Sequence, residues 1–127
     1  MMKLACSLLA ITVTTLSAYA ASRTEGVIDA AVLARFPASY ADQSTWVAGC
    51  LTQHQHGTFI SPCNDDDWHN ITRVYDTQNL VRAAVPSLRG PKIFYEVQGT
   101  FHGVLDTSGT RNVFRLDAVD GLVIYEP

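Results

Sequence analysis

The sequence has no cluster of basic residues, and this absence bears on its partners. It holds 9 Lys and Arg against 12 Asp and Glu, which gives a formal net charge of −3 at pH 7. A mildly acidic chain without a basic patch has little electrostatic attraction for a phosphate backbone or an anionic membrane surface. We therefore expect no nucleic-acid partner.

The sequence also lacks an apolar run of about 20 residues, the length that a membrane-spanning helix needs. Its opening, MMKLACSLLAITVTTLSAYA, has one positive charge at Lys3, an apolar run interrupted by Ser and Thr, and a small-x-small ending at Ala20. This pattern is typical of a secretory signal peptide cleaved after Ala20. Residues 1–20 are therefore predicted to direct export to the periplasm or the outside of the cell. Retention as an uncleaved anchor is the alternative.

Cysteine is scarce, since the chain has three and Cys6 lies in the predicted signal peptide. Cys50 and Cys63 would remain in a compartment where disulfides persist. If His56-Gly57 forms a two-residue turn, residues equidistant from it pair across a hairpin, which places Cys50 opposite Cys63. We predict a disulfide that staples this hairpin. A redox pair is the alternative, but such pairs usually have two intervening residues and these cysteines have twelve.

No motif of catalytic groups stands out. Ser61 is not surrounded by a strained nucleophile motif, and Pro62 follows it directly. The consecutive Asp65, Asp66 and Asp67 lack the alternate spacing of a calcium loop. We therefore assign no catalytic residue and no cofactor, and we expect a protein that is not an enzyme.

Histidines are the remaining candidates for metal chemistry. His54 and His56 flank Gln55 and would share one face of a strand, while His69 follows the three aspartates. Imidazoles with carboxylates would suit zinc or copper(II). Histidines at a hairpin tip are more often simply solvated, so metal binding stays an alternative.

The fold is predicted from a change of period along the chain. Residues 23–43 carry a loosely helical stripe that Pro37 should end, which predicts a short N-terminal helix. From Trp46 onward, alternating apolar and polar residues predict strands at about 46–53, 57–62 and 69–75, then two long strands in KIFYEVQGTFHG and RNVFRLDAV. The apolar spacing in DTQNLVRAAVPSLRG predicts one helix between the third and fourth strands, with Asp76 or Thr77 as its cap.

This order predicts a mainly β fold, a small five-stranded OB-type barrel with one helix between strands 3 and 4 and a short N-terminal helix. The domain would span residues 45–127, and residues 21–44 would form the N-terminal segment. Asp120-Gly121 is expected to form a tight turn or a bulge before the last strand.

The run GCLTQHQHGTFISPC, an apolar strand, LVRAAVPSL and then KIFYEVQGTF resembles the OB-fold domain of bacterial envelope lipoproteins of the NlpE type. The resemblance implies a non-enzymatic envelope module associated with stress sensing and surface contact. The chain departs from that family because it lacks a well-placed lipidation cysteine and a preceding lipocalin-like barrel with its Cys-x-x-Cys motif. Only the fold and the compartment therefore carry over.

Three functions follow as hypotheses. The first is a secreted or periplasmic OB-type module that binds a protein or a small ligand without chemistry. The second is an inhibitor or immunity protein against a toxin or wall-degrading enzyme, whose acidic loop would enter a basic cleft. In either case the candidate contact residues are Asp65, Asp66, Asp67 and Trp68. The third is a metal-binding envelope protein that uses His54, His56 and His69.

Overall fold

The computed structural model describes residues 26–88 and 94–126, so the predicted signal peptide lies outside the described residues. The strands are β1 (Val27–Asp29), β2 (Ser44–His54), β3 (Gly57–Ser61), β4 (Thr72–Tyr75), β5 (Tyr95–Asp106) and β6 (Val113–Ile124). The helices are α2 (Ala30–Arg35), α3 (Pro37–Tyr40) and α4 (Leu80–Ala84), with 3-10 turns η1 (Trp68–Asn70) and η2 (Pro86–Leu88).

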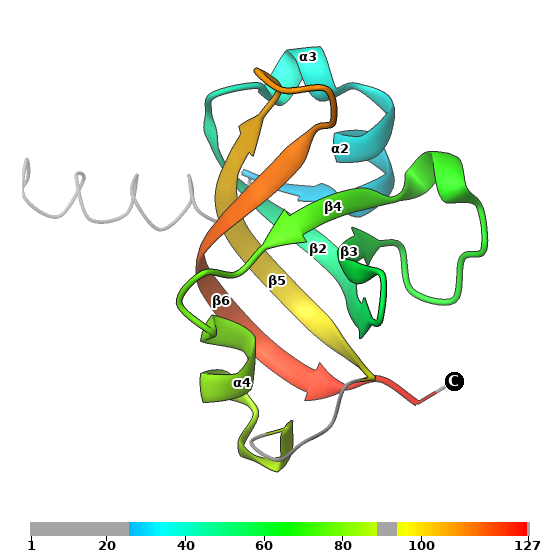
Figure 1. Ribbon diagram of the computed structural model, residues 1–127, viewed down its shortest axis with the longest axis vertical. Helices are drawn as coiled ribbons and strands as arrows, with labels where there is room; N and C mark the ends of the chain where they lie inside the picture. The colour runs from blue at the N-terminus through cyan, green and yellow to red at the C-terminus, as the bar shows by residue number, and fades with distance from the viewer. Residues whose placement is uncertain (1–25, 89–93, 127) are drawn as a thin grey trace, which may run out of the picture.

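Five of the strands close a ring, as Figure 1 shows. β2 pairs antiparallel with β3 on one edge and with β5 on the other, and β5 pairs antiparallel with β6. β4 completes the ring because it pairs antiparallel with β3 and parallel with β6. The predicted mainly β fold is confirmed, as one six-stranded mixed sheet in which β1 runs parallel to the start of β2.

The two long strands alternate as their sequences predict. Val97, Phe101 and Leu105 of β5 and Phe114 and Leu116 of β6 are buried inside the ring. Near its end β6 shifts register against β5 at Gly121, which has a φ of 63°. The expected irregularity is therefore a bulge, and β6 continues through it.

The helical segments differ in number from the prediction. The N-terminal stripe forms β1 and two short helices, because Pro37 has no N–H to donate and so ends α2 and opens α3. Asp29 caps α2 by accepting a hydrogen bond of 2.8 Å from the Ala31 N–H. The single helix expected over residues 76–90 is shortened to α4, and its end at Gly90 lies outside the described residues.

Helices cover the two ends of the ring (Figure 1), with α2 and α3 at one end and α4 at the other. The N-cap position of α4 is Asn79, but the predicted Asp76 does bond the first turn, since its carboxylate accepts from the N–H groups of Leu80 and Val81 at 2.8 and 3.0 Å. Both ends and the strands contribute to one core. Its buried members are Ala30, Leu33, Val47, Leu51, Ile60, Val74, Val81, Val85, Leu88, Val97, Phe101, Leu105, Phe114 and Leu116. Within residues 26–88 and 94–126, no helix has the length and apolar character to cross a membrane.

The turn between β5 and β6 supplies a pH-dependent contact. Asp106 accepts hydrogen bonds from the Ser108 hydroxyl at 2.6 Å, the Ser108 N–H at 2.9 Å and Arg115 Nε at 3.2 Å. These bonds, those from Ser108 above all, lower the pKa of Asp106 to about 2. A depressed folded-state pKa means that the carboxylate stabilises the turn above the ordinary value near 3.8 and loses that contribution as pH falls through about 2.

We therefore expect the Asp106 carboxyl carbon to titrate in NMR with a midpoint of about 2. In Ser108→Ala, which loses the hydroxyl donor, the midpoint should rise toward 3.8. A midpoint near 3.8 for Asp106 in the unmodified chain would contradict the assignment.

Candidate functional site

A disulfide joins Cys50 to Cys63, with 4.9 Å between their Cα atoms, which confirms the predicted bridge. The predicted hairpin register is wrong. Cys50 pairs with Ser61 and His54 with Gly57, so the two turn residues are Gln55 and His56. The positive φ of 130° falls on Gly57, and the glycine therefore follows the turn instead of forming part of it. Cys63 consequently lies beyond the end of β3.

The bridge fastens the segment after β3 onto the outer face of the ring. Leu51 is buried in the core, and its neighbour Cys50 leaves the strand on the opposite face. Cys50 has no exposed surface, and its sulfur is bonded to Cys63 in the segment after Pro62. We call residues 62–71 the acidic loop, since it contains Asp65, Asp66 and Asp67.

The acidic loop is held in shape by its own side chains. Asp65 accepts a hydrogen bond from the Asp67 N–H and another from Asn70 Nδ2, both at 2.8 Å. Asn70 in turn accepts from Arg35 Nε of α2 at 2.6 Å. The Asp65 carboxylate therefore stabilises the conformation of the loop and also contributes to its negative charge.

Asp67 and Trp68 lie on the side of the loop that faces α2 and solvent. Asp67 pairs with Arg35 at 3.2 Å and accepts from the His69 N–H at 3.0 Å and the His69 ring at 2.9 Å. The hydrogen bond from the His69 N–H, with that from its ring, lowers the pKa of Asp67. Trp68 is 72% exposed and stacks on His69.

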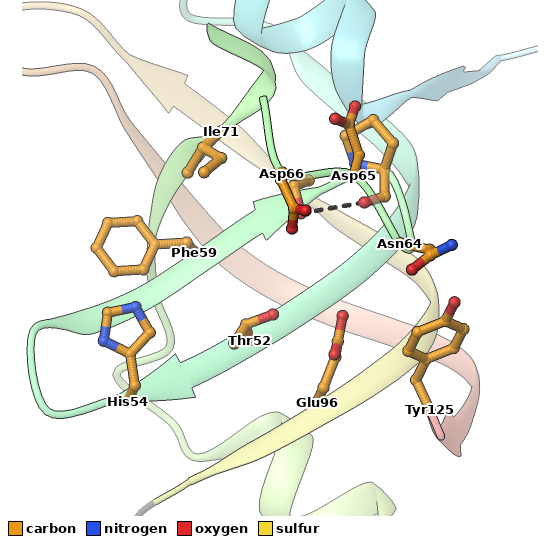
Figure 2. A pocket seen from close by; sticks show the side chains of 11 residues that line it. Thr52, His54, Phe59, Asn64, Asp65, Asp66, Ile71, Glu96 and Tyr125 are labelled. Carbon is orange, nitrogen blue, oxygen red and sulfur yellow. Dashed lines mark hydrogen bonds between the residues drawn. The ribbon is translucent and has the colours of Figure 1, made fainter. Parts of the chain in front are cut away.

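A hollow of about 510 Å³ lies on the outer face between the acidic loop, β2, β3, β5 and the end of the chain. Figure 2 shows His54 and Phe59 on one side of Thr52, with Glu96 and Tyr125 on the other. No lysine or arginine lines the described hollow. Its walls combine carboxylates and rings, from Asp65, Asp66, Glu96, His54, Phe59 and Tyr125.

Strand register explains how distant residues meet here. Glu96 of β5 pairs with Thr52 of β2, and Thr52 pairs with Phe59 of β3. Directly paired residues point to the same face of a sheet, so these three side chains form one row. The Tyr125 N–H donates to the Glu96 carbonyl at 2.9 Å, which holds the C-terminal segment beside the row. His54 stacks on Phe59 with ring centroids 5.1 Å apart.

Of the predicted contact residues, Asp65 and Asp66 line the hollow, whereas Asp67 and Trp68 lie outside its lining. Glu96 and Tyr125 also line the hollow, and the sequence alone did not indicate them as site residues. The alternation of KIFYEVQGTFHG puts Glu96 on the solvent face, but nothing in the sequence pairs it with Thr52.

The three candidate metal ligands are distributed over two places. The rings of His54 and His56 lie 5.6 Å apart at the hairpin tip, while His69 bonds to Asp67 in the acidic loop. Residues 26–88 and 94–126 contain no group of three or more His, Cys, Asp or Glu side chains arranged to hold a metal ion. The Ser61 hydroxyl donates to the Pro62 carbonyl.

A second polar cluster lies on the outer face of β5 and β6. His102 hydrogen-bonds to Asp117, and its ring lies 4.9 Å from that of Trp46. The pair occupies neighbouring strands, whereas the hollow gathers carboxylates and rings from several elements. We therefore take the hollow as the candidate site. Comparison with known proteins finds no family model, no curated protein and no solved structure that matches the chain.

Proposed function

We propose that the protein is an exported, non-enzymatic binding module of the OB type that takes a cationic group of its partner into the acidic hollow. The observation that carries the proposal is the hollow itself, in which carboxylates from separate elements meet aromatic walls and no lysine or arginine is among the described lining residues. The partner would be a protein or a small ligand that carries a guanidinium or ammonium group.

The strand order supports the OB assignment. The ring has three strands, a helix and two strands in chain order, and its parallel pairing joins the third strand to the fifth. OB folds are five-stranded Greek-key barrels that bind ligands on an outer face. The resemblance to envelope lipoproteins of the NlpE type, the predicted signal peptide and the disulfide together favour an oxidising compartment such as the periplasm.

The lining chemistry supports a cationic ligand. Asp66 is exposed at the rim, and its carboxylate makes no hydrogen bond or ion pair with any described side chain. Tyr125 offers a ring on which an alkyl chain or a guanidinium can pack, whereas the Phe59 ring is already in contact with His54 and the Arg73 guanidinium. Charge attraction of this kind speeds association and selects partners, and salt weakens it.

The test is capture of envelope proteins by the immobilised chain and by two variants with the same chemical change. Asp66→Asn removes a carboxylate at the hollow, whereas Asp42→Asn removes one from an exposed site before β2, where a φ of 60° suits asparagine. We expect Asp66→Asn to weaken capture about fivefold, as loss of roughly 1 kcal/mol of charge pairing predicts, and Asp42→Asn to leave it unchanged. If both variants captured partners equally well, the hollow would not be part of the binding surface.

A second candidate function is inhibition of an enzyme, and the exposed Trp68 favours it. This ring stands on the acidic loop with 72% of its surface in solvent, in a position to insert into a cleft. An inhibitor would abolish the activity of the captured enzyme in a stoichiometric complex. A binding module would leave that activity intact.

A further inference from the structure

The row of paired residues on the outer face continues past the hollow and changes charge. After Glu96, Thr52 and Phe59, the next paired residue is Arg73 of β4, followed by Val113 of β6. The Arg73 guanidinium lies over the Phe59 ring, 5.1 Å from its centroid. The row therefore runs from the Glu96 carboxylate past the Phe59 side chain to the Arg73 guanidinium.

Two further hollows continue the first along this row. The second, of about 750 Å³, shares Phe59 and Ile71 with the acidic hollow and is mainly apolar, with Leu33 and Pro37 in its wall. The third, of about 360 Å³, shares Arg73 and Arg111 with the second. Together they form a surface that we call the outer groove, which has carboxylates at one end, an apolar wall in the middle, and arginines from the middle to the other end.

The basic end has uncommitted positive charge. Arg115 there pairs with Asp106 at 3.2 Å and lies over the Tyr75 ring. Arg73 and Arg111 line the same hollow and make no ion pair with any of the described carboxylates. The outer groove therefore has two guanidinium groups toward one end and the carboxylates of Asp66 and Glu96 at the other.

Resting on the proposed function, we propose that the outer groove binds an extended peptide that carries a basic side chain at one end and an acidic side chain at the other. The basic side chain would enter the acidic hollow, and the acidic one would meet Arg73 and Arg111. The row from Glu96 to Arg73 crosses three strand spacings, about 14 Å. An extended peptide covers that distance in about four residues at roughly 3.3 Å each.

Charge decides against the other extended polymers. A nucleic acid would bring phosphates to Asp66 and Glu96, where like charges repel them. A neutral glycan can hydrogen-bond to either end of the groove but carries no charge to neutralise the carboxylates or the guanidinium groups. A peptide supplies both charges at a spacing that its sequence can adjust, with an apolar side chain for the middle.

The experiment uses three pools of acetylated, amidated hexapeptides whose interior residues are randomised over uncharged amino acids. One pool carries Arg at the second position and Asp at the sixth, four residues apart and on one face of an extended chain, and the other two carry Arg at both or Asp at both. Retention by the full chain is measured by equilibrium dialysis and mass spectrometry. We expect the mixed pool to be retained about tenfold more than either like-charged pool, as about 1.4 kcal/mol of electrostatic discrimination predicts.

Charge reversal gives a matched pair of variants. Glu96→Lys should shift the preference to the pool with two Asp, and Arg111→Glu, which changes an exposed loop residue, should shift it to the pool with two Arg. An unchanged melting temperature verifies that each variant folds. Equal retention of the mixed and double-Arg pools, or retention of no pool, would overturn the peptide assignment. The proposed function would then still be judged by capture with Asp66→Asn, which does not depend on the basic end.

Discussion

Reduction of the Cys50–Cys63 bridge is expected to lower the free energy of unfolding by about 3 kcal/mol. The bridge spans a sequence separation of 13 residues, and opening it restores loop entropy to the unfolded chain. This is a large share of the roughly 5–15 kcal/mol that stabilises a small domain. Urea unfolding followed by circular dichroism, with and without reductant, measures the difference.

The double variant Cys50→Ala, Cys63→Ala is the control for the reductant. It should match the reduced protein in stability and should not respond to reductant itself. Because the bridge also fastens the acidic loop over β2, the variant should bind partners more weakly than the oxidised chain even where it is fully folded. Equal unfolding midpoints for oxidised and reduced protein would show that the loop is held by its hydrogen bonds alone.

Gly103→Ala is expected to cost about 3 kcal/mol or to prevent folding, at the upper end of the range for overpacked sites. A Cβ at this position would lie 2.9 Å from the Arg115 carbonyl carbon and closer still to its oxygen. The obstacle is backbone of the paired strand, at a register shift between His102 and Gly103. No side chain can move aside to relieve the clash, so β5 and β6 would have to separate.

Gly109→Ala is the matched control, because its Cβ would meet nothing nearer than the Arg111 carbonyl oxygen at 3.8 Å. It lies in the exposed turn between the same two strands. We expect its urea midpoint to stay close to that of the unmodified chain. A small effect of Gly103→Ala, similar to that of Gly109→Ala, would show that the ring tolerates separation of β5 from β6.

The two long strands could be predicted from the local sequence, because the alternation of apolar and polar residues directly indicates which face of a strand is buried. Val97, Phe101 and Leu105 repeat with a period that only a strand presents to one side. The hairpin register was less predictable, since Gly57 suits a place within a turn or just after one. β1 was missed because three residues are too few to show a period.

The candidate site was predictable only in part. Asp65 and Asp66 were visible as an unusual acidic run, and the cysteines indicated that the run was tethered. Glu96 and Tyr125 join them through pairings between strands far apart in sequence, which no local pattern specifies. The same holds for Arg73, whose relation to Glu96 exists only once four strands are in register.

The double pairing of β2 has a consequence for the order of folding. Its first partner, β3, follows after only two turn residues. Its second partner, β5, comes much later, since Gln53 of β2 and Tyr95 of β5 are 42 residues apart in the sequence. In a chain that crosses a membrane amino end first, the β2–β3 hairpin can form while β5 is still in transit, because hairpins close within microseconds. Both cysteines belong to this early part of the chain, so oxidation can precede ring closure. Until β5 arrives, the edge of β2 that β5 will occupy is free to pair with another chain.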